Sequence, residues 1–206
     1  MLGAMQFLKF LEGVASKGEA VNLVFEERLF NLVGILRKIT DPLEAACVPY
    51  EVIGGLAVLI HVEEADPEQS VLTRDIDILI DRSNLQRVIA LAESQGFSFR
   101  HAAGVDMLLH GDKATNAVHL CFTGENVRPS QLKLNPTLAP ERKTVKGQDV
   151  WVIGVADLVQ MKLSANRDKD RVHIRSLYAA GLITPAIEHG LPEPLRARLQ
   201  QVRETE

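Results

Sequence analysis

The sequence predicts an α/β (α+β) fold in which a small mixed sheet is flanked by helices at both ends of the chain. Apolar residues recur at helical spacing before about residue 46 and again after residue 157. Between these segments lie short apolar runs of strand length, separated by glycine and proline turns. This order of elements indicates a single domain over residues 1–206, with helices in 1–46, a core in 47–156 and further helices in 157–206.

The N-terminal part is expected to be helical from about Met5 to Lys38. We expect Gly18 to separate two helices, because glycine weakens a helix interior. Asp41-Pro42 is expected to begin a further short helix, since proline is tolerated in a first turn.

A glycine pair follows the first predicted strand. The strand covers residues 48–53 and runs into Gly54-Gly55, after which residues 56–62 have helical character. Residues 63–70 are polar, contain a proline and indicate a loop. The strongest strand signal in the chain comes next, over residues 71–81.

The remaining elements alternate between short strands and amphipathic helices. A helix over residues 85–95 has Ser83 or Asn84 as its N-cap and Gly96 as its C-cap. Three strands are then expected, at 97–100, 105–109 and 117–122. An extended connection over 125–140 leads to one more strand at 150–153. A long helix over 157–180, ended by Gly181, follows.

Charge is distributed unevenly along the chain, although its net value is only −4. Residues 41–81 carry ten acidic side chains and one basic side chain, whereas residues 160–206 carry eight basic and six acidic ones. The net charge does not indicate nucleic-acid binding. The uneven distribution predicts an acidic rim that faces a basic segment, which suits a cation with a polyphosphate; acidic loops without a function are the alternative.

The composition is that of an ordinary globular protein, with 46% hydrophobic and 24% charged residues. No apolar run approaches the ~20 residues needed to cross a bilayer, and no signal peptide is recognisable, so we expect a cytoplasmic protein without a membrane partner. Cys47 and Cys121 are far apart and have no CxxC partner, which favours buried free thiols over a zinc ribbon or a disulfide framework.

The candidate chemistry centres on Asp75 and Asp77. Alternate residues of a strand point to the same face, so these two carboxylates are expected to lie side by side. Such a pair can hold Mg²⁺ together with substrate phosphate oxygens. The alternative is an exposed strand edge on which the acids prevent aggregation. The nearby Gly54-Gly55 turn favours the metal site, because glycines let the backbone approach phosphate.

These residues resemble the signature of the DNA-polymerase-β-like nucleotidyltransferase superfamily, and most closely the AbiEii-like bacterial nucleotidyltransferases, some of which are toxins paired with an antitoxin. The resemblance rests on residues 52–57, with Gly54-Gly55, on residues 72–80, with Thr73-Arg74-Asp75-Ile76-Asp77, and on the helix over 157–170. It implies the nucleotidyltransferase fold and transfer of a nucleotide from a nucleoside triphosphate to an acceptor, which would be a protein, a tRNA or a small molecule.

The resemblance also implies roles for individual residues. Asp75 and Asp77 would be catalytic and hold Mg²⁺ or Mn²⁺. Gly54, Gly55, Thr73, Lys162 and Asp170 would contact the nucleotide.

The strand that usually supplies a third carboxylate offers His119 here, with Asp106 as its rival for that position. Because of His119, a nucleotide-binding or protein-interaction module with weakened catalysis is the first alternative function. An unrelated structural α/β domain is the second. His173 is expected to be an ordinary core or surface histidine, and residues 167–171 a solvated helix face.

Overall fold

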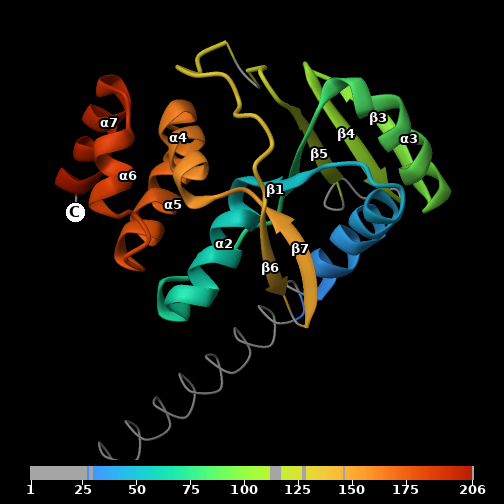
Figure 1. Cartoon of the computed structure of the whole chain (residues 1–206), viewed down its shortest axis with the longest axis horizontal. Helices are drawn as coiled ribbons and strands as arrows, with labels where there is room; N and C mark the ends of the chain where they lie inside the picture. The colour runs from blue at the N-terminus through green and yellow to red at the C-terminus, as the bar shows by residue number, and fades with distance from the viewer. Residues whose placement is uncertain (1–26, 28–29, 112–116, 127–128, 146, 206) are drawn as a thin grey trace, which may run out of the picture.

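A seven-stranded mixed sheet forms the centre of the molecule, with strand order β3-β4-β5-β2-β1-β7-β6 (Figure 1). The computed structural model describes residues 27, 30–111, 117–126, 129–145 and 147–205. Its strands are β1 (Glu51–Ile53), β2 (Ile76–Ile80), β3 (Phe97–Ala102), β4 (Val105–His110), β5 (Ala117–Phe122), β6 (Glu141–Val145) and β7 (Gln148–Val152). The pairs β2/β5 and β1/β7 are parallel, and the other neighbouring pairs are antiparallel.

Helices cover both sides of the sheet. They are residues 30–45, α2 (Gly54–Ala65), α3 (Leu85–Ser94), α4 (Val155–Ala165), α5 (Asp168–Ala179), α6 (Pro185–Gly190) and α7 (Glu193–Glu204), with the short 3₁₀ turns η1 (Pro67–Gln69) and η2 (Arg82–Asn84). In Figure 1, α2 and α4 to α7 lie on one side, whereas α3 and residues 30–45 lie on the other. This arrangement confirms the predicted fold class. Within the described part of the chain, no helix is long and apolar enough to cross a membrane.

Strand β2 suits the centre of the sheet because it is apolar at every position except Asp77 and is buried on both faces. Ile76, Ile78 and Ile80 are fully buried, and the parallel register pairs Ile78 with Leu120 of β5. Asp77 lies between these isoleucines in sequence, so its side chain points to the opposite face. The sheet therefore holds an acidic residue on one face without exposing the apolar face.

The helix over residues 30–45 runs through Pro42, so the expected start of a new helix at Asp41-Pro42 is wrong. Proline removes only its own N–H from the helical ladder, and the Ala46 amide still donates to the Pro42 carbonyl. A buried stripe that includes Ile39 and Leu43 continues across the proline. The predicted break at Gly18 and the helix start at Met5 lie outside the described residues.

Three further expectations need correction. Strand β2 begins only at Ile76, because β1 has three residues and its pairing with β2 ends at Ile53↔Asp77. Strand β6 was not predicted, since an exposed edge strand has no need for alternating apolar residues. Cys47 is exposed rather than buried because it adopts a left-handed conformation (φ 53°) at the end of the helix over residues 30–45, whereas Cys121 is buried as expected.

Candidate active site

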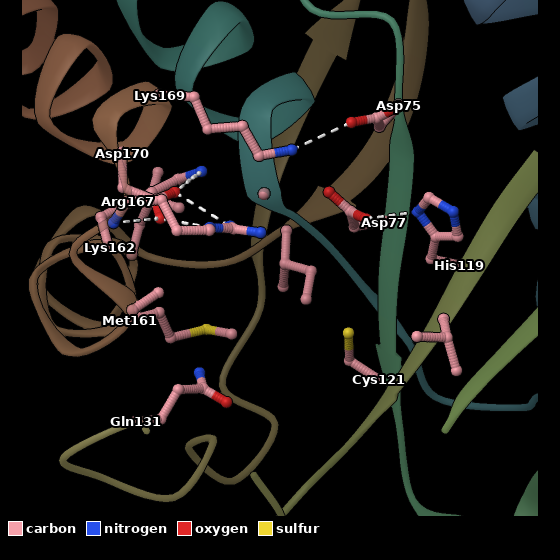
Figure 2. Close-up of a pocket in the computed structure, with 15 residues that line it drawn as sticks. Asp75, Asp77, His119, Cys121, Gln131, Met161, Lys162, Arg167, Lys169 and Asp170 are labelled. Atoms are coloured by element: carbon pink, nitrogen blue, oxygen red, sulfur yellow. Dashed lines mark hydrogen bonds and ion pairs between the residues drawn. The ribbon is translucent and has the colours of Figure 1, made fainter. Parts of the chain in front are cut away.

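A pocket of about 270 Å³ opens where the end of β1, the start of β2 and strand β5 meet helices α4 and α5 (Figure 2). Acidic residues from β2 and its approach line one wall, and basic residues from α4 and α5 line the other. The lining residues are Ile53, Gly54, Asp75, Asp77, Val105, His119, Cys121, Gln131, Leu158, Met161, Lys162, Ala165, Arg167, Lys169 and Asp170.

The glycine pair makes room for two side chains of the acidic segment. A Cβ atom on Gly54 would lie 2.0 Å from Oδ2 of Asp77, and one on Gly55 would lie 2.5 Å from Oγ1 of Thr73. Gly54 also adopts φ +72°, which L-residues rarely tolerate. Residues 54–55 and 73–77 are therefore joined by direct contact, which requires glycine at both positions.

Asp75 and Asp77 both face the pocket, but each has a different partner (Figure 2). Asp77 Oδ1 lies 3.0 Å from Nδ1 of His119, because the parallel register places residues 77 and 119 opposite each other. This hydrogen bond raises the pKa of His119 above its usual value, and burial opposes the rise. Asp75 precedes the strand, and a hydrogen bond from its backbone amide to the side-chain Oγ1 of Thr73 (3.3 Å) fixes the turn.

Asp106, the rival for the third acidic position, lies elsewhere. Its neighbour Met107 is the cross-strand partner of His119, so alternation turns Asp106 to the opposite face of the sheet. There it is buried, forms an ion pair with Arg82 and is hydrogen-bonded to His101. The structure therefore does not bring Asp106 to the acidic pair, whereas it does bring His119 there.

A buried ion cluster forms the basic wall. Lys162 is 5% exposed and donates to Oδ1 of Asp170 at 3.2 Å, while Asp170 is completely buried. Arg167 also donates to Asp170, through Nε at 2.6 Å and Nη2 at 3.1 Å. Burial lowers the pKa of Lys162, although Asp170 opposes this shift. Burial of Asp170 would raise its pKa, but the hydrogen bond from Arg167 and the charge of Lys162 bring it below its usual value.

Lys162 and Asp170 meet for a different reason from the one the sequence indicated. Their spacing suggested one continuous helix, with both residues on the same face two turns apart. Instead the helix ends at Ala165, Asn166 takes a left-handed conformation (φ 50°), and α5 starts at Asp168. The chain turns back, so Asp170 approaches Lys162 from a second helix.

Arg167 and Lys169 are pocket residues that the sequence reasoning missed. The mixed-charge run around them was interpreted as a solvated face. Lys169 Nζ instead lies 3.1 Å from Oδ2 of Asp75 on the opposite wall. The available signal was the charge split, because the basic C-terminal segment does face the acidic segment across this pocket.

His173 is a core histidine, one of the two expected settings. It is buried behind Gly55, with Cε1 3.2 Å from the position of a Gly55 Cβ atom. Burial and the neighbouring positive charge of Lys162 lower its pKa to about 4. His173 is therefore neutral at physiological pH and supports the glycine turn from behind.

Of the three carboxylates that line the pocket, Asp170 is fully buried and bound to Lys162 and Arg167, so the partly exposed Asp75 and Asp77 are the ones accessible to a cation. Across the residues that the structure describes, no group of three or more His, Cys, Asp or Glu side chains is placed to hold a metal ion. Asp75 and Asp77 suit Mg²⁺, which typically takes one or two carboxylates and completes its shell with water and substrate phosphates. The donor set thus fits a cation that arrives together with a polyphosphate.

Comparison with known proteins yields structural matches alone. The sequence matches no protein-family model and no curated protein. One similar structure is ANT(2'')-Ia in complex with adenylyl-2''-tobramycin, with TM-score 0.53 and 13% identity over 84% of this chain and 97% of that one.

Two more structures resemble the chain to the same degree. The lincosamide antibiotic adenylyltransferase LnuA, bound to lincomycin, has TM-score 0.51 and 17% identity over 71% of this chain and 96% of that one. An antigenic nucleotidyltransferase-like protein from Paracoccidioides brasiliensis has TM-score 0.52 and 14% identity over 87% of this chain and 88% of that one. Together with the mixed sheet and its helices, these matches show that the chain has the nucleotidyltransferase fold.

Proposed function

We propose that this protein transfers a nucleotide from a nucleoside triphosphate to a hydroxyl group of an acceptor, with Mg²⁺ or Mn²⁺ as cofactor. One observation carries the proposal. A single pocket of about 270 Å³ has Asp75 and Asp77 on one wall and three cationic side chains on the other, where Asp170 balances only part of their charge. A cation bound to a polyphosphate is complementary to both walls, because the cation meets the carboxylates and the phosphates meet Lys162, Arg167 and Lys169.

The proposed roles follow from these positions. Asp75 and Asp77 hold the cation, which when bound neutralises phosphate charge and favours in-line attack by the acceptor. Gly54 and Gly55 begin α2, so their backbone and the positive end of the helix face the phosphates, with Thr73 beside them. Asp170 holds Lys162 and Arg167 in place before substrate arrives, which avoids reorganisation during the reaction.

We also propose the narrower affiliation with AbiEii-like nucleotidyltransferases, a toxin-like role with a cognate antitoxin, and a cytoplasmic location. The support for these proposals is the motif set of residues 52–57, 72–80 and 157–170. Expression of the protein alone should slow growth, and co-expression with its genomic neighbour should relieve the effect. Growth that is unaffected by expression of an active protein would contradict the toxin role.

One observation favours a second function, a nucleotide-binding module with weak catalysis. His119 stands where a third carboxylate is expected, and it bonds to Asp77. A neutral imidazole brings no negative charge to a magnesium site. In that case the protein would bind nucleoside triphosphates without turnover.

The test follows each end of the triphosphate separately. The full chain is incubated with cell extract, divalent cation and each ribonucleoside triphosphate, labelled at the α- or the γ-phosphate. We expect the α-label to appear on a protein, RNA or small-molecule fraction, which identifies the acceptor class, and the γ-label to appear as pyrophosphate.

Asp75→Asn and Asp77→Asn should abolish this transfer without unfolding the protein, because both carboxylates are partly exposed and like charges repel in the absence of a cation. Asp106→Asn is the matched control. It should reduce stability, since Asp106 is a buried partner of Arg82 and His101, but it should leave transfer intact. Tight binding without label transfer would favour the binding module, and unfolding of Asp75→Asn or Asp77→Asn would contradict both functions.

A further inference from the structure

Lys169 and Asp75 form an ion pair across the mouth of the pocket, and the proposed function does not require it. Nζ of Lys169 lies 3.1 Å from Oδ2 of Asp75, and the side chain extends from α5 across the pocket in Figure 2. The two side chains are 52% and 44% exposed. An ammonium group thus occupies the side of Asp75 that faces the opposite wall.

Lys169 differs from the other two cations of the pocket in its freedom to move. Lys162 and Arg167 are both bound to the fully buried Asp170, so displacement of either would take one of two cationic partners from a buried carboxylate. The partners of Lys169 are in contact with solvent, and such exposed ion pairs contribute little to stability. Lys169 is therefore the cation that can change partner at low cost.

A divalent cation and the Lys169 ammonium compete for the same carboxylate. A metal ion at Asp75 would lie within a few ångströms of Nζ, and like charges at that separation repel. A triphosphate supplies the ammonium with a new partner on its own side of the pocket. The flexible four-carbon stem of lysine allows this change without movement of α5.

We propose, on the basis of the function proposed above, that Lys169 is a counterion with two positions. It neutralises Asp75 in the empty site and moves to the phosphates when a metal–nucleotide complex binds. Lys169 thereby disfavours binding of metal alone and favours binding of metal together with triphosphate. The same side chain therefore lowers the affinity for metal alone and raises the affinity for metal with triphosphate.

The test measures binding rather than turnover. The affinity of the full chain for Mn²⁺ alone is measured from the electron paramagnetic resonance signal of the free ion, and its affinity for the Mn²⁺ complexes of α,β-methylene analogues of the four ribonucleoside triphosphates is measured by equilibrium dialysis of the analogue. Lys169→Met keeps the apolar stem and removes the charge. We expect it to bind Mn²⁺ alone about fivefold more tightly than wild type and the Mn²⁺–nucleotide complex about fivefold less tightly.

Two variants serve as controls. Arg171 is exposed two residues further along α5 and bonds to Asn166 at 3.2 Å, outside the pocket. Arg171→Met should change both affinities less than about twofold and in the same direction, through screened long-range charge. In the double variant Asp75→Asn/Lys169→Met, the gain in affinity for Mn²⁺ alone should disappear.

The outcomes separate the two proposals. If Lys169→Met shifts both affinities in the same direction, or shifts neither, the two-position role is overturned while the proposed function stands. If the wild-type protein binds neither Mn²⁺ nor the Mn²⁺–nucleotide complexes, the proposed function fails and this inference fails with it.

Discussion

At the scale of single residues, the site depends on two close approaches between backbone and side chain. Gly54 contacts the carboxylate of Asp77, and Gly55 contacts the hydroxyl of Thr73. The two motifs are joined by the register Ile53↔Asp77 of β1 and β2 rather than by their distance in sequence. For this reason the polar segment over residues 63–70, which the sequence indicated as a loop but which holds the end of α2 and the 3₁₀ turn η1, does not separate them.

Gly54→Ala should remove the proposed metal binding, because its Cβ atom would lie 2.0 Å from Asp77 Oδ2 and displace that carboxylate. The expected loss of stability has two parts: ~1 kcal/mol for the left-handed backbone and a further ~1–3 kcal/mol for overpacking. Gly96→Ala is the matched control. Gly96 has φ +83° and nothing within 4 Å of its Cβ position, so the variant should lose only the stability that arises from the left-handed backbone.

Urea unfolding and Mn²⁺ titration of both variants measure these effects. Equal stability losses for Gly54→Ala and Gly96→Ala, with metal binding retained in both, would show that the contact with Asp77 does not shape the site.

His119 should decide the metal preference of the proposed transfer reaction. Nitrogen ligands suit Mn²⁺ better than Mg²⁺, so wild-type transfer is expected to be faster with Mn²⁺. His119→Asp places a carboxylate opposite Asp77, where the imidazole now lies at 3.0 Å, and should raise Mg²⁺-dependent transfer relative to Mn²⁺-dependent transfer. Initial rates with each metal give the ratio. An unchanged ratio would mean that residue 119 only orients Asp77.

At the scale of elements, the sequence predicted the strands and helices whose apolar residues repeat regularly. Strand β4 and helix α3 carry their buried residues at regular spacing, β2 and β5 are short apolar runs buried at nearly every position, and the glycine pair marks the start of α2. Strand β6 was missed because its sequence, Glu-Arg-Lys-Thr-Val, reflects an exposed edge rather than a buried face. Apolar periodicity contains no information about such an element.

The basic wall was predicted in part, because Lys162 and Asp170 were identified through the family resemblance rather than from their environment. Arg167 and Lys169 were not identified, since a mixed-charge run gives no indication of the turn that directs it into a pocket. That turn is made by one residue, Asn166, which lies between α4 and α5 in the left-handed conformation.

Replacement of Asn166 should therefore affect the whole basic wall. Asn166→Gly should be nearly neutral, because glycine adopts φ 50° without strain. Asn166→Ala should cost ~1 kcal/mol of stability. It should also weaken triphosphate binding, because relief of the strain would extend α4 and shift Arg167 and Asp170. Urea unfolding and nucleotide titration separate the two effects. Wild-type nucleotide affinity in a destabilised Asn166→Ala protein would show that the turn does not position the wall.

At the scale of the whole molecule, a buried carboxyl group on the face of the sheet that carries Asp77 joins β1 to a distant segment of the chain. Glu51 of β1 is buried on this face and accepts a hydrogen bond from the Ala139 amide in the connection that leads to β6. Its other carboxylate oxygen has no hydrogen-bond partner among the described residues. Burial raises the pKa of Glu51 to about 7, and the charge of Asp157 on α4 adds to the rise, while the Ala139 amide opposes it.

This buried carboxyl group should make stability depend on pH. The folded pKa of about 7 lies above the ordinary glutamate value of 4.5, so the folded state binds the proton more strongly than the unfolded state. The stabilisation is therefore complete below pH ~4.5 and is lost as the pH rises towards 7, on the order of 3 kcal/mol in total. His173 acts in the opposite direction. Its folded pKa of about 4 lies below 6.5, so its contribution is lost as the pH falls through this range.

Glu51→Gln should remove the alkaline part of this profile. Glutamine keeps an oxygen acceptor for the Ala139 amide but has no charge to bury, so the variant should match wild type near pH 4.5 and exceed it above pH 7. The contributions of His173 and Asp170, which are lost as the pH falls, and that of His119, which is lost as the pH rises, should remain unchanged in the variant. Urea unfolding of both proteins at intervals from pH 4 to 8.5 gives the two curves. If the curves stay parallel over the whole range, Glu51 does not titrate in the folded protein, and the connection to Ala139 is held by an ionised carboxylate instead.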